Sequence, residues 1–313
     1  MYSIERYDAS CHEEAWNSFV AKSKNGTFLF DRNYMDYHQD RFTDHSLMCY
    51  FKDHLYAILP ANEKGETIFS HQGLTYGGLI MDERATAENI ISLFRQINNY
   101  YRQHGFQHMV YRPTPWIYHN LPAEEDIYAI FHACNAKLTA KEISTTIMAG
   151  RPMKWSTLRT RCANKARKNE VTVHQSDDLG AFWNILSNNL TNKYQVKPVH
   201  TLHEIRLLQS RFPNNIRLTG AFLHGEMIGG ILLYHTKQVV HSQYIAANDL
   251  GKELGAIDLI MHEILHQEKM EQTYFDFGKS TEAHGTVLNE NLIHQKEGFG
   301  GRAVCYDTYE WEL

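Results

Sequence analysis

The chain has 313 residues, and 43% of them are hydrophobic, which is enough for ordinary folded cores and favours two domains at this length. A net charge of −5 argues against a general nucleic-acid binder, so no DNA partner is expected. No apolar run of about 18 residues and no signal-peptide pattern is present, and the five cysteines form no CxxC pair. These features argue against a membrane span and a disulfide framework, and we expect a reducing cytoplasm as the compartment.

The hydrophobic pattern of the first half predicts a mixture of helices and short strands. The expected elements are a strand at 2–7, helices at 12–23 and 32–41, strands at 46–51, 55–61 and 67–74, a helix at 86–103 and a strand at 107–112. Polar turns join the three central strands, and a loop containing Gly77 and Gly78 precedes the long helix. This order describes a β-meander followed by a helix and a further strand.

The second half repeats this order. Its expected elements are strands at 217–223, 227–234 and 239–246, a helix at 256–269 and a strand at 273–277. One constant offset aligns Phe51 with Phe222 and Gln72 with Gln243. We interpret the two halves as copies of one α+β unit. Because Pro152 breaks regular structure between them, we expect one domain at 1–150 and a second at 151–313.

A basic segment opens the second domain. Residues 154–168 carry six basic side chains and no acidic one, and a short strand is expected after them at 171–173. Apolar residues recur on one face of the predicted helix, so its cations face outward. Two interpretations stay open: a site for the phosphates of a nucleotide-linked or lipid-linked substrate, or a solvated helix face. For the first interpretation the candidate substrate-binding residues are Arg159, Arg161, Lys165 and Lys168.

The C-terminal region carries the most specific pattern. An aromatic strand at Tyr274–Phe277 ends at Gly278, and the segment Lys296–Gly301, which reads Lys-x-Gly-Phe-Gly-Gly, follows a polar helix. This arrangement resembles the signature of the Fem-type branch of the GNAT acyltransferase superfamily. The resemblance implies an α+β fold of two tandem GNAT-like (acyl-CoA N-acyltransferase) domains with mixed central sheets. The first domain is then a degenerate copy, and the second carries the donor site.

For function, the resemblance implies an N-acyltransferase that moves an acyl group from acyl-CoA, such as acetyl-CoA, to an amine. The expected acceptor is a small molecule, an amino sugar or a cell-envelope precursor. Three alternatives stay open: a Fem-type peptidyltransferase that uses aminoacyl-tRNA on a cell-wall precursor, a catalytically silent GNAT-like binding protein, and a zinc hydrolase. The acidic net charge disfavours tRNA as a partner.

A candidate donor loop follows the third strand of the second half. In GNAT enzymes the backbone amides of this loop hold the pyrophosphate of coenzyme A. The candidate cofactor-binding residues here are Asn248, Gly251, Lys252, Gly255 and Ala256. The glycines are in place, but the usual Gln/Arg-x-x-Gly-x-Gly/Ala spacing is missing, and Asp249 and Glu253 are acidic. The alternative is a loop that only turns the chain into a helix.

The candidate catalytic residues also come from the second half. An amine that attacks an acyl carbonyl must lose a proton, so a base is required. The candidates are His241, Tyr244 and Asp276, each with a structural role as its alternative. The resemblance implies that Lys296 faces the substrate and neutralises a phosphate or the developing oxyanion, and the alternative is a surface lysine. The repeat adds three substrate-binding candidates from the first half, which are His71, Gln72 and Tyr76.

The segment His262–His266 matches the zinc-binding pattern His-Glu-x-x-His, which places two imidazoles on one helical face. The chain contains 19 histidines, so a chance match is common enough to make the pattern weak. Nothing singles out a third ligand, and the segment falls on a helix that the repeat already explains. We therefore expect no metal.

Overall fold

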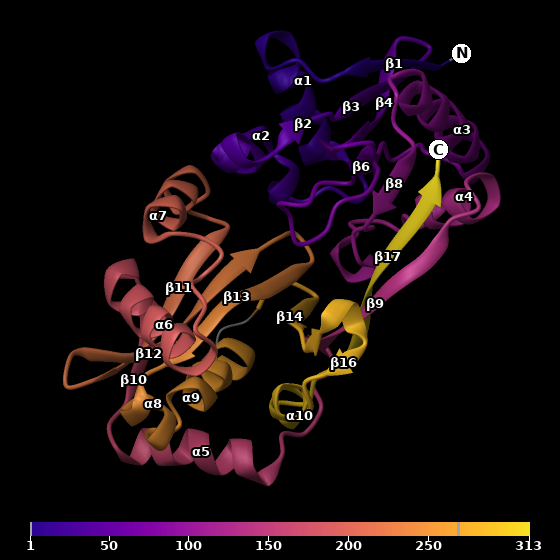
Figure 1. Ribbon diagram of the computed structural model, residues 1–313. Coiled ribbons are helices and arrows are strands. Elements are labelled where there is room, and N and C mark those ends of the chain that lie inside the picture. The colour runs from indigo at the N-terminus through magenta and orange to yellow at the C-terminus, as the bar shows by residue number, and fades with distance from the viewer. Residues whose placement is uncertain (1, 268–269) are drawn as a thin grey trace. The chain divides into compact units, whose positions relative to one another are not determined.

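The computed structural model describes residues 2–267 and 270–313, and the chain forms two compact units (Figure 1). Unit 1 comprises Met1–Ile143, Thr281–Val287 and Cys305–Leu313, and unit 2 comprises Ser144–Ser280 and Leu288–Val304. The predicted boundary at 150 lies close to the point where the chain passes from unit 1 to unit 2. The C-terminal region was expected to belong wholly to the second domain, but it returns in part to unit 1 because its last strand pairs with a strand of that unit.

Unit 1 combines two sheets with helices. The first sheet has the order β1-β3-β4-β7, and the second has the order β9-β17-β8-β6-β5-β2. The strands are β1 (Tyr2–Arg6), β2 (Thr43–Asp44), β3 (Leu47–Phe51), β4 (His54–Leu59), β5 (Asn62–Lys64), β6 (Thr67–Phe69), β7 (Ile80–Met81), β8 (His108–Tyr111), β9 (Lys137–Met148) and β17 (Arg302–Glu312). The helices are α1 (Ala9–Lys22), α2 (Arg32–Met35), α3 (Ala87–Gln103) and α4 (Glu125–Ala133). Strands β9 and β17 each extend into unit 2, and β15 (Thr281–Glu282) and β16 (Val287–Leu288) form a short ribbon.

Helix α3 covers the core of unit 1 because its apolar residues recur at helical spacing. Five hydrophobic residues of its buried face have 0% exposure, and they are Ile90, Leu93, Phe94, Ile97 and Tyr101. They join strand residues of β3, β4 and β8 in one apolar cluster. Full burial of an aliphatic or Phe side chain contributes about 1.5–3 kcal/mol relative to exposure. This face therefore anchors the helix, and the helix predicted at 86–103 is confirmed.

Two predicted elements of unit 1 differ from the structure. The strand predicted at 67–74 ends at Phe69, because His71 adopts a left-handed backbone with a φ of 64° and turns the chain. The helix predicted at 32–41 is α-helical only to Met35 and continues as a 3₁₀ turn at Asp36–Arg41. The third strand of the expected meander is thus replaced by β7, which pairs with β4.

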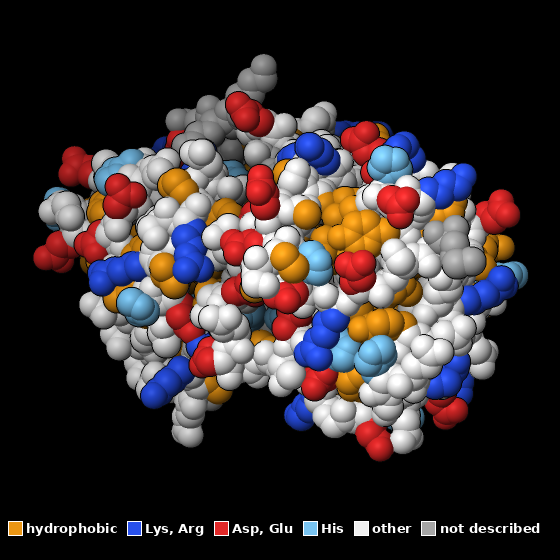
Figure 2. Space-filling model, turned by 90° about the horizontal axis from the view of Figure 1, so that it is seen from above, with side chains coloured by type: hydrophobic (Ala, Val, Ile, Leu, Met, Phe, Trp, Pro, Cys, Tyr) orange, Lys and Arg blue, Asp and Glu red, His pale blue; other side chains and the backbone are white. Residues whose placement is uncertain are grey.

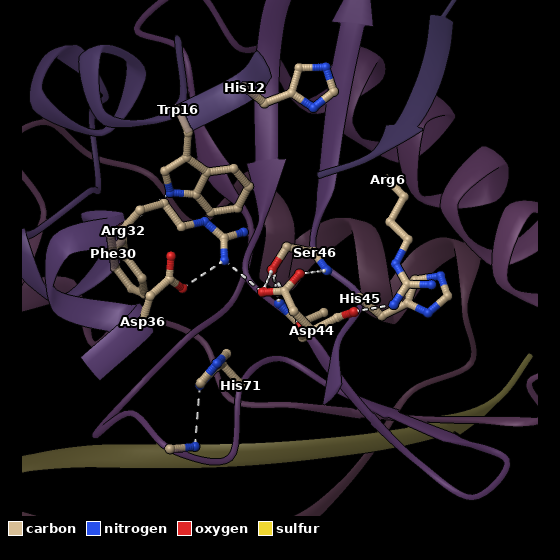
Figure 3. Close-up of polar contacts among 12 residues, drawn as sticks. Arg6, His12, Trp16, Phe30, Arg32, Asp36, Asp44, His45, Ser46 and His71 are labelled. Carbon is tan, nitrogen blue, oxygen red and sulfur yellow. Dashed lines mark hydrogen bonds and ion pairs between the residues drawn. The ribbon is translucent and has the colours of Figure 1, made fainter. Parts of the chain in front are cut away.

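A cluster of ion pairs surrounds the buried Arg32 of α2 (Figure 3). The Arg32 side chain is 1% exposed, and its guanidinium carbon lies 3.5 Å and 4.1 Å from the ring centroids of Tyr7 and Trp16. Arg32 Nη1 donates to Asp44 Oδ2 at 2.6 Å and pairs with Asp36 Oδ1 at 3.4 Å. The two carboxylates and the aromatic faces compensate the burial of this charge. The cluster thereby fixes α2 against β2.

Unit 2 is a mixed sheet with helices on both faces (Figure 1). The strand order is β10-β11-β12-β13-β14-β9, and β13 and β14 form its parallel pair. The strands are β10 (Thr172–Ser176), β11 (Ile216–Leu223), β12 (Glu226–His235), β13 (Val239–Ala247) and β14 (Tyr274–Lys279). The helices are α5 (Thr157–Lys168), α6 (Leu179–Tyr194), α7 (Leu202–Arg211), α8 (Asp249–Leu254), α9 (Ala256–His262) with a π-helical turn at Glu263–Gln267, and α10 (Glu290–Gly298). The predicted strands of this half are confirmed, and the last two positions of the helix predicted at 256–269 lie outside the described residues.

The side chains of β12 show which helices cover which face. Ile231 and Leu233 pack with Leu259 of α9 in one apolar cluster. On the opposite face, a Cβ added to Gly230 would lie 2.8 Å from the ring of Phe182 on α6, so the glycine permits the close approach of that helix. Because both faces are covered, β12 is buried almost continuously rather than at alternate positions.

Charge is distributed rather than segregated on the part of the surface that Figure 2 shows. Acidic, basic and histidine side chains are interspersed there, in keeping with a net charge of only −5. Within the described ranges, no helix combines the length and the apolar character needed to cross a bilayer.

Candidate active site

The sheet of unit 2 opens between its two parallel strands. β13 and β14 pair only over Val239–His241 and Tyr274–Asp276, although both strands continue beyond these positions. The register of β13 against β12 shifts just after this point, which leaves Gln243 as the extra residue of a β-bulge. A bulge bends its strand. The backbone beyond the His241–Asp276 pair therefore borders an opening in the sheet.

A cavity of about 710 Å³ occupies this opening. Most of its lining is apolar and comes from β13, β14 and the helices on both faces. The apolar lining residues are Leu186, Leu190, Ile245, Ala246, Ala247, Ile257, Phe277, Leu292 and Phe299, and the polar ones are Asn189, Asn192, Asp249, Lys252, Gln295 and Lys296. Cavities of about 300–1,000 Å³ with an apolar lining and a few polar groups are typical small-molecule sites.

Two candidate catalytic residues meet where the strands separate. Asp276 has 0% exposure, and its Oδ2 lies 3.0 Å from Nδ1 of His241. Its Oδ1 accepts hydrogen bonds from Ser144 Oγ at 2.5 Å, Thr146 Oγ1 at 3.2 Å and Gly278 N at 3.2 Å. An ionised carboxylate only accepts hydrogen bonds, so His241 donates from Nδ1. That tautomer places the imidazole lone pair on Nε2, as a general base requires.

Lys296 reaches the same place from α10. The residue is 6% exposed, and its Nζ donates to the carbonyl oxygens of Gly278 and Lys279 at 2.8 Å and 2.9 Å. Burial lowers the pKa of Lys296 to about 8, and the charge of Asp276 opposes this lowering. Lys296 also lines the cavity. It is therefore a buried lysine that binds the last two residues of β14, and the alternative of a surface lysine is wrong.

Tyr244 contacts His200 and Trp183 rather than His241, Asp276 or Lys296. Its hydroxyl lies 2.7 Å from Nδ1 of His200, and its ring meets the indole of Trp183 edge-on at 5.4 Å. Burial raises the pKa of Tyr244. These contacts join β13 to α6 and to the segment before α7, whereas His241, Asp276 and Lys296 cluster at the strand separation.

The predicted donor loop is only partly at the cavity. Lys252 lines it, and its Nζ donates to Asn189 Oδ1 at 2.9 Å and to Asp249 Oδ1 at 3.0 Å. Asn248 caps α8 by accepting a hydrogen bond from Gly251 N at 2.8 Å. Lys252 is thus the residue of this loop that offers positive charge to a ligand.

The remaining loop candidates, Gly251, Gly255 and Ala256, have structural roles in the packing of the backbone. A Cβ on Gly251 would lie 2.1 Å from the carbonyl oxygen of Ile228, and one on Gly255 would lie 2.5 Å from that of Cys162. Gly255 also has a φ of 85°, and Ala256 has 0% exposure. The two glycines therefore allow α8 and α9 to pack closely on β12 and α5.

The cations of α5 divide into two groups. Arg159 forms an ion pair with Asp258 at 3.0 Å, where burial raises the pKa of Asp258 to about 6 and Arg159 opposes that rise. Lys165 Nζ donates to the carbonyl oxygen of Glu253 at 2.7 Å. Arg161 and Lys168 are exposed. Two of the four predicted substrate-binding cations therefore dock α5 on its neighbours, and two face solvent.

The three candidates from unit 1, His71, Gln72 and Tyr76, are buried or hydrogen-bonded within that unit. His71 is 5% exposed, and burial lowers its pKa to about 3. Gln72 Oε1 accepts a hydrogen bond from Asn62 Nδ2 at 3.0 Å, and Tyr76 donates to Thr27 Oγ1 at 3.2 Å. Their predicted role in substrate binding stays a prediction.

The His-Glu-x-x-His segment lies at the end of α9 and in its π-helical turn. The rings of His262 and His266 stack with centroids 4.7 Å apart, and Trp155 meets both edge-on. Arg167 Nη2 donates to His262 Nδ1 at 2.6 Å, so a cation already occupies that nitrogen. Over the described parts of the chain, no group of three or more His, Cys, Asp or Glu side chains is arranged to hold a metal ion.

Sequence reasoning missed the partners that orient the site. Ser144 and Thr146 lie on β9, and this strand was not predicted. The cavity residues of α6, such as Leu186, were missed as well. The run of serine, threonines and isoleucine at 144–147 is a usable β signal, because β-branched residues favour strands.

Comparison with known proteins finds a family model that is similar to part of the chain. Residues 156–284 match the family described as Acetyltransferase (GNAT) domain. This part of the chain is thus similar to GNAT acetyltransferase domains. No curated protein matches the chain.

Solved structures resemble the whole chain. The crystal structure of FemX aligns with a TM-score of 0.70 at 10% identity, over 99% of this chain and 97% of FemX. L-PGS from Bacillus licheniformis aligns with a TM-score of 0.62 at 11% identity, over 98% and 92% of the two chains. A tandem GNAT protein from the clavulanic acid biosynthesis pathway aligns with a TM-score of 0.52 at 10% identity, over 100% and 98%. At these identities the likeness establishes the fold, and the predicted Fem-like tandem GNAT fold is confirmed.

Proposed function

We propose that unit 2 transfers an acyl group from acyl-CoA to the amine of a small molecule, an amino sugar or a cell-envelope precursor. The observation that carries this proposal is the cavity between the diverging ends of β13 and β14, with His241 and Asp276 where the strands separate. The match to a GNAT acetyltransferase domain supports acyl transfer in general. The apolar walls suit the arm that carries the thioester, and Lys252 suits a phosphate of the donor.

The residues of the site define the roles in this reaction. The amine nitrogen attacks the thioester carbonyl carbon, His241 Nε2 accepts the proton that the amine loses, and the carbon–sulfur bond breaks as coenzyme A leaves. Asp276 keeps His241 in the required tautomer and orientation. Two of the three N–H groups of the Lys296 ammonium donate to backbone carbonyls. In this proposal the third N–H donates to the leaving thiolate. Burial lowers the pKa of Lys296 to about 8, which suits proton donation to a thiolate.

Donor binding is tested by titrating the full chain with CoA and acetyl-CoA in a calorimeter. Lys252→Glu is expected to weaken binding at least about tenfold, because it removes a charge-assisted contact and adds repulsion. Arg206→Glu is the matched control, since Arg206 is an exposed residue of α7 that does not line the cavity. Gly255→Asp is unsuitable as a test, because its Cβ would meet the carbonyl of Cys162 and the variant would disturb folding. Equal affinity in Lys252→Glu and wild type contradicts the donor site.

Catalysis is tested by following free CoA thiol after acetyl-CoA is mixed with glucosamine, ethanolamine or spermidine as probe acceptors. The proposal expects thiol release that depends on the amine. It also expects His241→Gln to lower kcat by about 10²–10⁴-fold while CoA affinity stays unchanged. CoA binding without turnover on any amine favours the catalytically silent alternative.

An aminoacyl-tRNA donor is the second candidate, and the exposed cations of α5 favour it. Arg161 and Lys168 face solvent, as residues that contact a nucleic-acid backbone do. If tRNA is the donor carrier, Arg161→Glu combined with Lys168→Glu abolishes binding of aminoacyl-tRNA in a filter assay, and CoA shows no binding. If acyl-CoA is the donor, the same double variant leaves CoA binding intact.

A further inference from the structure

A second cavity lies on the α9 face of the unit 2 sheet, at the strand ends that α9 does not cover. Its volume is about 450 Å³. Leu233 and Val240 form its apolar floor, and Ile264 of the π-helical turn and Met270 form part of its wall. Among the described residues, it shares no lining residue with the cavity between β13 and β14. The two cavities are therefore separate sites.

Strand register explains why polar residues line this cavity. Arg217 is opposite Leu233, and His235 is opposite Val240. Directly opposed residues point to the same face of a sheet, and both Leu233 and Val240 belong to the apolar cluster under α9. Arg217 and His235 therefore point to the face of the sheet that α9 covers, where apolar residues are expected.

Neither polar group has a hydrogen-bond or ion-pair partner among the residues that the structure describes. Arg217 is half-buried and forms no hydrogen bond or ion pair with the residues that the structure describes. His235 Nε2 is buried and likewise lacks a hydrogen-bond partner among the described residues. Burial lowers the pKa of His235 to about 4, and Arg217 lowers it further, so its imidazole is neutral at pH 7. Unpaired buried polar groups are unfavourable unless a ligand or water pairs with them.

The charge balance of the lining favours an anion. Arg217 and Lys237 are cationic, and Glu271 is the acidic residue of the described lining. A guanidinium presents a planar fork of N–H donors that matches the two oxygens of a carboxylate or phosphate. Asn214, Gln175 and Gln272 add amide groups that bind further polar atoms.

We propose that this cavity binds a small organic anion whose phosphate or carboxylate group pairs with Arg217 and His235 and whose body lies on Leu233 and Val240. The site is independent of the acyl-transfer proposal, because it rests on other residues. The volume of about 450 Å³ lies in the range of small-molecule sites.

Calorimetric titration of the full chain with inorganic phosphate, glycerol 2-phosphate and succinate tests the proposal and distinguishes phosphate from carboxylate. Arg217→Gln is expected to weaken binding of the preferred anion at least about tenfold. Arg206→Gln is the matched control and keeps wild-type affinity. Equal affinity in Arg217→Gln and wild type overturns the proposal, as does the absence of binding by all three anions.

A second measurement keeps the test decisive even if Arg217→Gln does not fold. The ¹³Cε1–¹H NMR signal of His235 is identified by its loss in His235→Asn. In the wild-type chain, saturation with the preferred anion is expected to shift this signal, while the signal of the exposed His203 on α7 stays in place. An unmoved His235 signal at saturation places the anion elsewhere and overturns the proposal.

Discussion

Asp276→Asn is the most informative single change in this protein. Oδ1 of Asp276 accepts three hydrogen bonds, from Ser144, Thr146 and Gly278, and an asparagine oxygen retains this capacity. The other oxygen, 3.0 Å from His241 Nδ1, becomes an NH₂ group that donates. His241 must then accept at Nδ1 and carry its hydrogen on Nε2. The variant therefore keeps the volume of the site while it reverses the tautomer that the proposed base needs.

The expected loss in rate follows from this reversal. A positioned general base contributes about 10²–10⁴-fold to a rate, which corresponds to about 2.7–5.4 kcal/mol of activation free energy. The free energy of unfolding is expected to fall as well, by about 0.5–2 kcal/mol, because the hydrogen bond to His241 is no longer made by a charged group. The activity loss is thus expected to exceed the loss in stability.

The assay is steady-state release of CoA thiol with the best probe amine, combined with urea unfolding of each variant. Asp258→Asn is the matched control, because Asp258 is also a buried acid of unit 2 and its partner, Arg159 at 3.0 Å, lies outside the proposed catalytic group. It is expected to lose stability without a comparable loss in kcat. If Asp276→Asn retains kcat within about twofold of wild type, the reasoning about the His241 tautomer would be refuted.

Three further predictions concern stability, each measured by urea unfolding. Gly255→Ala is expected to destabilise the protein by more than about 2 kcal/mol. The left-handed backbone alone costs about 1–2 kcal/mol, and the new Cβ would lie 2.5 Å from the carbonyl oxygen of Cys162. Unchanged stability contradicts the role given to Gly255 between α8 and α9. Arg32→Ala removes the buried guanidinium together with its hydrogen bond to Asp44 and is expected to cost about 1.5–3 kcal/mol. Arg84→Ala, at an exposed pair, should cost less than about 1 kcal/mol, and equal losses speak against the cluster of Figure 3. Burial raises the pKa of Asp126 from 3.8 to about 7, so the folded state holds a proton that the unfolded state releases, and this group makes stability fall as pH rises between those values. Asp126→Asn is expected to lack that fall, and parallel pH profiles for variant and wild type count against the assignment.

Some features of the site follow from local sequence. Short-range patterns correctly predicted several elements. They are the apolar runs of β12 and β13, the glycine before α9 and the helical spacing of α3. The aromatic strand and the Lys-x-Gly-Phe-Gly-Gly segment led to Asp276 and Lys296, which the structure brings to one place. Within one element the backbone geometry dictates which side chains share a face, so neighbours along the chain are enough to predict it.

Other features depend on pairings between distant segments. The hydrogen bonds of Ser144 and Thr146 to Asp276 span more than a hundred residues, and β9 was not predicted. The division of the C-terminal region between the units depends on β17 pairing with β8. The roles of Gly251 and Gly255 depend on which backbone lies against them.

The sequence by itself determined the α+β class, the GNAT resemblance and most of the candidate residues of unit 2. Only the tertiary structure decided that His241, Asp276 and Lys296 cluster at the opening between β13 and β14, that Arg159 and Lys165 dock α5, and that Arg217 and His235 line a second cavity. The physical reason is that periodicity reports which side of an element is buried. Burial, charge pairing and register between distant strands decide what each buried group meets.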